Sequence, residues 1–196
     1  MENRNYVFWL IGICVIIFIL QSFIPYINDN FTLVSSRVLN EPWMLITSMF
    51  LHGDLVHLLN NMLALFIFGM ILENSIGSKR FLIVYFVSGV FAGLIASFFY
   101  NAALGASGAI FGVLGTLVML KPKMVVYVYF MPLPMYLAGI LWALIDISRF
   151  FFPTGIASAA HLAGLFIGLG FGYYFKKKFG DKYFDDELNI VEHWEK

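Results

Sequence analysis

The stretch GASGAIFG at residues 105–112 lies inside a strongly apolar part of the chain and places one serine among glycines. A second stretch, AHLAGLFIG at residues 160–168, places a histidine among small and apolar residues. Polar or ionisable side chains at membrane depth are energetically costly, which makes them functional candidates. A serine beside a histidine is the minimal pair of nucleophile and base. The two stretches therefore predict a membrane protein that brings Ser107 and His161 together.

The composition of the whole chain is that of a membrane protein. Of its 196 residues, 61% are hydrophobic and only 12% are charged, whereas a soluble domain has about 25% charged residues. The formal net charge is zero, so no basic surface indicates a nucleic-acid partner. A single cysteine, Cys14, lies in an apolar run, which excludes a disulfide framework and a cysteine-based zinc motif.

Six apolar stretches divide the chain and predict an all-α, polytopic membrane protein. We expect membrane spans at residues 6–24, 55–72, 81–100, 106–120, 135–152 and 158–175. Residues 25–54 are polar enough for an external loop, and residues 124–134 are too short to span and contain two prolines, which favours an interfacial or re-entrant segment. The predicted core is therefore 1–175, followed by a charged cytoplasmic tail at 176–196.

The distribution of basic residues predicts the orientation of this six-helix bundle. With both termini in the cytoplasm, ten of the twelve Lys and Arg residues lie inside, and only Arg37 and Arg149 lie outside. An excess of Lys and Arg marks the cytoplasmic loops of multi-pass proteins. We therefore expect a cell-membrane protein whose Ser107 and His161 lie near the external ends of their helices, in a site that is open to the external side.

Ser107 opens the fourth predicted span, where a helix has unpaired backbone N–H groups. These groups and the positive end of the helix dipole can stabilise an oxyanion on a carbonyl that the serine attacks. Gly105 and Gly108 allow the close approach of a substrate backbone and of a neighbouring helix. The alternative is simple helix packing, because small residues four apart are common in membrane helices.

His161 strengthens the catalytic interpretation because of the glycines that share its helical face. Gly164, Gly168 and Gly172 follow it at spacings of i+3, i+7 and i+11. Such a face packs closely on the glycine-rich fourth span, which runs in the same direction. A hydrogen bond between Ser107 and His161 is then expected. The alternative for a lone histidine is a structural hydrogen bond to a backbone carbonyl.

The second predicted span contributes another polar cluster. His57 and Asn61 are four residues apart and share a helical face, and the Asn61 amide beside His57 suits an oxyanion hole. His52, about one turn further out, is an accessory candidate. A metal site of His52, His57 and His161 is disfavoured, because the two nearer histidines are not an i, i+4 pair and no glutamate lies between them. Polar contacts between helices are the remaining alternative.

Asp146 is the nearest candidate for a third catalytic residue. It precedes Arg149 by three residues in the fifth predicted span, so the two side chains share one helical face. We interpret Asp146 as half of a local ion pair near the outer interface. Nothing in its spacing connects it with His161.

Three motifs occur in a fixed order across the predicted spans: His-x4-His-x3-Asn, Gly-x-Ser-Gly and His-x2-Gly-x3-Gly. In this order, over about residues 40–175, the chain resembles the rhomboid family of intramembrane serine proteases. The resemblance implies a Ser107–His161 dyad without an acid, and an oxyanion held by His57, Asn61 and the Ser107 N–H. It also implies that Phe111 packs under the histidine.

One position departs from the family pattern. The external loop of the family often has arginine after tryptophan, whereas Met44 follows Trp43 here. That arginine is thought to brace the loop, so the resemblance does not predict how this loop is held.

The resemblance implies an intramembrane serine endopeptidase in membrane lipid. Its partners would be transmembrane protein substrates with a small residue before the cut and helix-breaking residues nearby. No metal, cofactor or nucleic acid is expected. Two alternatives stay open: a proteolytically inactive relative that binds membrane segments, and a six-helix transporter. The first would be expected to lack the serine or the histidine, and the second would predict internal repeats, which the sequence does not show.

Overall fold

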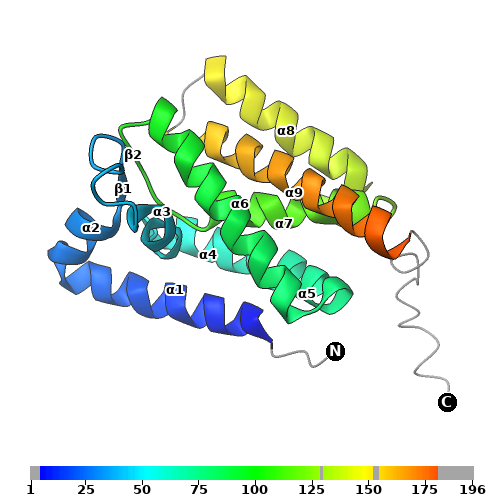
Figure 1. Cartoon of the computed structure of the whole chain (residues 1–196), viewed down its shortest axis with the longest axis horizontal. Helices are drawn as coiled ribbons and strands as arrows, with labels where there is room; N and C mark the ends of the chain where they lie inside the picture. Colours follow the sequence, from blue (N-terminus) through cyan, green and yellow to red (C-terminus); the bar gives the residue numbers. More distant parts are fainter. Residues whose placement is uncertain (1–4, 129, 152–154, 181–196) are drawn as a thin grey trace.

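The apolar stretches form long helices that pack side by side (Figure 1). The computed structural model describes residues 5–128, 130–151 and 155–180. The long helical segments are α1 (Tyr6–Phe23), α4 (Leu55–Ala64), α6 (Ser78–Phe99), α7 (Ser107–Leu120), α8 (Met135–Phe151) and α9 (Ser158–Phe179). α4 continues through a π-helical turn, η2 (Leu65–Gly69), into α5 (Met70–Ile76). The prediction of an all-α protein is confirmed in that the described residues are mostly helical, with four short strands besides.

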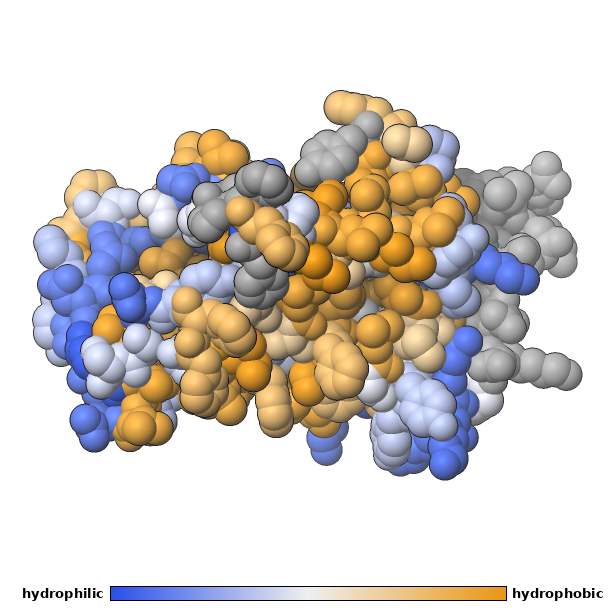
Figure 2. All heavy atoms as spheres, turned by 90° about the horizontal axis from the view of Figure 1, so that it is seen from above, coloured by the Kyte–Doolittle hydropathy of each residue, from blue (hydrophilic) through white to orange (hydrophobic). Residues whose placement is uncertain are grey.

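The outer surface of the bundle is suited to lipid. Among the described residues, three helical segments are long and apolar enough to cross a membrane: Tyr6–Phe23, Leu55–Ile76 and Ser78–Phe99. α7 is apolar but only 14 residues long, which corresponds to about 21 Å against a hydrocarbon core of about 30 Å. Figure 2 shows a broad apolar band with hydrophilic residues at its two ends. The protein is therefore embedded in a membrane.

The segment predicted as an external loop has structure of its own. It contains α2 (Pro25–Phe31), β1 (Leu33–Val34), α3 (Met44–Thr47) and a 3-10 turn, η1 (Ser48–Phe50). β1 pairs antiparallel with β2 (Ala102–Ala103), which directly precedes α7. The loop is thereby connected to the start of the helix that carries Ser107.

Several predicted span boundaries differ from the structure by three or four residues: the second span continues to Ile76 and the third begins at Ser78. Residues 124–134 form an antiparallel hairpin of β3 (Val125–Val128) and β4 (Met131–Pro134), because the two prolines disfavour a helix there. α9 extends beyond residue 175 through three lysines to Phe179 and ends at Gly180, whose φ is 81°. Lysines are favourable at a helix C-terminus and glycine is favourable just after it. The remaining part of the predicted tail, 181–196, lies outside the described residues.

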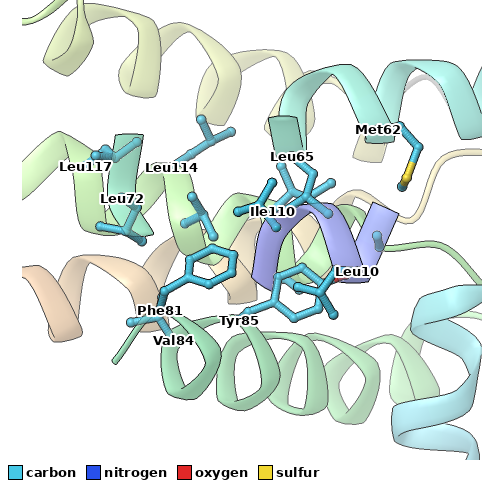
Figure 3. Close-up of a cluster of buried hydrophobic side chains, with 14 of the residues drawn as sticks. Leu10, Met62, Leu65, Leu72, Phe81, Val84, Tyr85, Ile110, Leu114 and Leu117 are labelled. Carbon is cyan, nitrogen blue, oxygen red and sulfur yellow. The ribbon is translucent and has the colours of Figure 1, made fainter. Parts of the chain in front are cut away.

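The main hydrophobic core lies between α1, the α4–α5 segment, α6 and α7 (Figure 3). Tyr85 and Phe81 are its largest fully buried side chains. At one edge of this core the Glu73 carboxylate accepts hydrogen bonds from the backbone N–H groups of Tyr6 (2.9 Å) and Val7 (3.1 Å). These are unpaired donors in the first turn of α1, so Glu73 caps that helix from a distant part of the sequence.

α7 and α9 run parallel and in direct backbone contact, along a line of glycines that we call the α7–α9 seam (Gly108, Gly112, Gly115, Gly164 and Gly168). A Cβ atom on Gly164 would collide with the carbonyl oxygen of Gly108, and one on Gly168 with that of Gly112. The Thr116 hydroxyl donates within this interface, at 2.9 Å from the Gly112 oxygen and 3.1 Å from the Gly168 oxygen. The seam places the first turns of both helices side by side.

Candidate active site

Ser107 is the first residue of α7 and follows a sharply turned backbone. Gly105 has a φ of 118°, a conformation that favours glycine, and its N–H donates to the Ser48 oxygen at 2.9 Å. The hydrogen-bond ladder of α7 begins with the Ile110 N–H, which donates to the Ala106 oxygen. The preceding N–H groups of the first turn therefore have no partner within the helix. They lie beside the Ser107 hydroxyl.

His161 lies in the first turn of α9, directly opposite Ser107. Its Nε2 is 2.8 Å from the Ser107 Oγ. One face of the imidazole stacks on Phe111, with ring centroids 4.3 Å apart and planes 7° from parallel. The side chain is buried. The phenyl ring and the seam together fix the position of this histidine.

The other imidazole nitrogen faces a carboxylate. Asp146 on α8 places its Oδ2 3.1 Å from the His161 Nδ1. Its Oδ1 accepts hydrogen bonds from Arg149 at 2.7 Å and from the Ser158 hydroxyl at 3.0 Å. The Asp146 side chain is only 1% exposed. Serine, histidine and aspartate thus form a continuous chain of hydrogen bonds.

The expected ion pair between Asp146 and Arg149 is confirmed. The interpretation of Asp146 as only half of a local ion pair is wrong, because its second oxygen contacts His161. The spacing of residues along α8 predicts only which side chains share its surface, whereas the contact with His161 depends on how α8 packs against α9. One feature of the sequence could have indicated this contact. Asp146 lies within a predicted membrane span, where a carboxylate needs partners from the protein.

His57 approaches the site from α4. Its backbone N–H is capped by Asp54 at 2.8 Å, and its Nδ1 accepts a hydrogen bond from the Gly53 N–H at 3.4 Å. In the neutral ring the proton is then on Nε2. A Cβ on Gly105 would lie 2.8 Å from this Nε2 and 3.9 Å from the Ser107 Oγ. His57 and Ser107 therefore flank Gly105, and the Nε2–H is a donor next to the serine.

Asn61 and His52 both contact His57. The buried Asn61 donates from Nδ2 to the His57 oxygen at 2.8 Å, within its own helix. The fully buried His52 ring contacts His57 edge-on, with centroids 5.1 Å apart. Gln21 holds the His52 backbone through two hydrogen bonds. Both residues thus adjoin His57.

The three histidines do not form a metal centre in the part of the chain that the structure describes, where no group of three or more potential ligands lies close enough to hold an ion. Burial, and to a lesser extent the neighbouring His57, lowers the pKa of His52 from 6.5 to about 4. This ring is therefore neutral at physiological pH. Its two buried nitrogens have no hydrogen-bond partner among the described residues.

A small cavity of about 30 Å³ adjoins the serine. Small side chains from α6 and from the α7–α9 region form most of its wall, together with residues of the loop before α7; they include Ser48, Gly89, Ala92, Ser107, Gly108 and Ala160. A space of this size holds one water molecule or one methyl group. Larger lining side chains would fill it.

A family model described as the rhomboid domain matches residues 39–178. Rhomboid protein 1, mitochondrial, from Saccharomyces cerevisiae is 32% identical over 193 residues, which cover 89% of this chain and 54% of that protein. Rhomboid protease GlpG from Haemophilus influenzae is 28% identical over 172 residues, which cover 84% of this chain and 87% of that protein. RHOMBOID-like protein 6, mitochondrial, from Arabidopsis thaliana is 39% identical over 80 residues.

The chain spans 26% of the length of this Arabidopsis protein and about half of the yeast protein. The matched family model nevertheless covers most of the present chain, including every residue of the candidate active site. The chain therefore belongs to the rhomboid family.

Proposed function

We propose that this protein is an intramembrane serine endopeptidase that uses Ser107 as its nucleophile and His161 as its general base. The observation that carries the proposal is the 2.8 Å contact between the Ser107 Oγ and the His161 Nε2. This pair lies at the start of two helices within a membrane-embedded bundle. Membership of the rhomboid family, which includes proteins named as proteases, supports the same activity.

The geometry suits a two-step hydrolysis of a peptide bond. His161 removes the hydroxyl proton as the Ser107 oxygen attacks the carbonyl carbon, and it then delivers that proton to the departing amine. An acyl-enzyme remains. Water attacks this ester with His161 again acting as base, and the carboxylic acid product leaves with Ser107 restored.

The developing oxyanion would be stabilised by donors around Gly105. The Ser107 N–H belongs to the unpaired first turn of α7, and the His57 Nε2–H lies on the other side of Gly105. Asn61 is the third proposed donor. Because its amide donates to the His57 oxygen, it would contribute through its second N–H or after a change of rotamer.

The proposed substrates are transmembrane proteins, cut in or beside their membrane segments. The apolar surface of the bundle would meet such a segment within the lipid (Figure 2). The cavity of about 30 Å³ beside Ser107 suits a small side chain, which supports cleavage after a small residue. Helix-breaking residues near the cut would let the substrate backbone extend toward the serine.

We further propose six spans with both termini in the cytoplasm. α1 begins and α9 ends at the same end of the molecule (Figure 1), and the lysines at the end of α9 are typical of a cytoplasmic boundary. The site then faces the external side. Because relatives include mitochondrial proteins, location in the cell membrane remains a prediction from the charge distribution.

The decisive experiment combines a serine-reactive fluorophosphonate probe with cleavage of a model transmembrane substrate, using the purified full chain in detergent. We expect labelling and cleavage by the wild type and by Ser97→Ala, whose half-buried serine donates to the Leu94 oxygen of its own helix. Both should be lost in Ser107→Ala, with thermal stability close to that of the wild type. Cleavage that survives Ser107→Ala would refute the nucleophile assignment, and an unreactive wild type would favour an inactive membrane-segment binder.

A further inference from the structure

The carboxylate of Asp146 is held in an asymmetric way. Arg149 and Ser158 both donate to Oδ1, whereas Oδ2 faces only the His161 Nδ1. The side chain is 1% exposed, so water cannot replace these partners. A simple surface ion pair would leave the second oxygen in solvent. Here the second oxygen is directed at the imidazole that contacts the serine.

We propose that Asp146 is a positioning residue, which holds His161 in the tautomer and orientation needed to accept the Ser107 proton. The expected effect of Asp146 on catalysis rests on the proposed function, whereas the position of the proton on the His161 ring does not. The proposal replaces a two-residue arrangement by the chain Asp146–His161–Ser107. Asp146 does not touch the reacting atoms and acts only through His161.

The physical reason is the hydrogen-bonding capacity of the groups. An ionised carboxylate only accepts, so the His161 Nδ1 must carry the proton that lies between them. A neutral imidazole has a single N–H, so its Nε2 is then left as the acceptor that faces Ser107. When His161 takes the serine proton and becomes positively charged, the same carboxylate stabilises the cation.

Arg149 and Ser158 determine where the carboxylate lies. The Arg149 guanidinium compensates the buried negative charge at 2.7 Å, and the Ser158 hydroxyl lies in the same first turn of α9 as His161. Since Ser158 bonds to Oδ1 and His161 to Oδ2, the carboxylate bridges two positions of α9. The arrangement therefore fixes the orientation of the Asp146 carboxylate as well as its position.

The first test reads the tautomer by NMR of ¹⁵N-histidine in the full-length protein, at an alkaline pH where imidazoles are neutral. His161→Gln identifies the signal. We expect the wild type and the Ser107→Ala variant to carry the proton on Nδ1. A wild-type His161 protonated on Nε2 would overturn the proposal without any need for a variant at Asp146 or for a protease assay.

The second test compares Asp146→Asn with Arg149→Gln on a model transmembrane substrate. An asparagine amide can donate to Nδ1, which moves the ring proton to Nε2 and leaves no acceptor for Ser107. For Asp146→Asn we expect kcat to fall by about 10³–10⁴-fold, with KM within a few-fold, together with the shift of the ring proton. Arg149→Gln should lower kcat much less than Asp146→Asn, because the Ser158 hydroxyl still donates to Oδ1 and Oδ2 still faces the His161 Nδ1.

The outcomes separate the two proposals. Equal losses of kcat in Asp146→Asn and Arg149→Gln, matched by equal losses of thermal stability, would make the aspartate a structural ion-pair partner and overturn the inference. If the wild type neither cleaves substrate nor reacts with the fluorophosphonate, the proposed function fails, and the tautomer measurement still decides whether Asp146 positions His161.

Discussion

The two sides of the active site are held by different interactions. On one side, the α7–α9 seam brings the backbones of two helices into contact, and a Cβ added at Gly115, Gly164 or Gly168 would collide with a carbonyl oxygen of the facing helix. On the other side, backbone contacts include the short β1–β2 pairing and the bond from the Gly105 N–H to the Ser48 oxygen, and side chains hold much of the segment from α2 to the start of α4. Gln21 binds the His52 backbone, Arg37 binds both the Glu41 carboxylate and the Asp29 oxygen, and Met44 is fully buried.

The two kinds of contact differ in how much sequence change they tolerate. A backbone-to-backbone contact allows few residues other than glycine, whereas a network of side-chain contacts can be built in several ways. Met44 illustrates the second case. Where the rhomboid pattern often has arginine, this chain buries Met44 among Leu33, Val38 and Ala92, and a different arginine, Arg37, braces the loop.

The largest expected effect tests whether the seam joins Ser107 and His161 into one unit. His161→Ala should lower kcat by about 10⁶-fold, and the double variant Ser107→Ala/His161→Ala should be no worse than either single variant, because the second loss removes nothing further. Steady-state kinetics on a model transmembrane substrate measure this. Losses that multiply in the double variant would show that the two residues act independently.

A smaller effect is expected on the side of the loop and α4. His57→Ala removes one proposed oxyanion donor and should lower kcat by about 10²–10³-fold while KM stays nearly constant. Asn61→Ala should have an effect of the same kind and no larger, because its amide already donates to the His57 oxygen. A rise in KM at constant kcat would instead identify both residues as substrate-binding contacts.

The seam itself is tested by one added methyl group. In Gly164→Ala the new Cβ would collide with the Gly108 oxygen, so we expect a loss of stability of about 1–3 kcal/mol and a lower kcat as His161 moves away from Ser107. Gly170→Ala on the same helix is the matched control, since a Cβ there meets nothing within 4 Å. Thermal midpoints in detergent should fall for the first variant only, because alanine is the better helix former and the Gly170 site has room for it. A midpoint of Gly164→Ala that stays level or rises, as in the control, would contradict the close backbone contact at the seam.

The smallest expected effect concerns how the stability of the protein depends on pH through His52, which lies just before α4. The pKa of His52 is about 4 in the folded protein and 6.5 without burial, so below pH 6.5 the unfolded chain binds a proton that the folded chain does not. The stability that the neutral His52 ring contributes should be fully present above pH 6.5 and be lost as the pH falls toward 4. Thermal midpoints measured from pH 7 to pH 4.5 should fall less steeply for His52→Gln than for the wild type. If the midpoints of the wild type and of His52→Gln fall in parallel with pH, the lowered pKa of His52 is contradicted.

Much of this protein could be predicted from local sequence alone. Apolar stretches of the right length predict the helices, because a span must satisfy its backbone internally and present apolar side chains to lipid. The glycines at i+3 and i+7 from His161 predict the face that packs on α7, since helical periodicity relates residues within one helix. These two regularities already place Ser107 and His161 at the starts of neighbouring helices.

Three contacts of the site and the core depend on how the helices pack against one another. Asp146 meets His161 because α8 packs against α9, Glu73 caps α1 from the far end of the α4–α5 segment, and the Gly105 turn places His57 beside Ser107. Each joins residues on different elements, and helical periodicity carries no information about which element lies opposite. The packing of the whole bundle makes that choice, because buried polar groups need partners and only the assembled structure brings those partners within hydrogen-bonding distance.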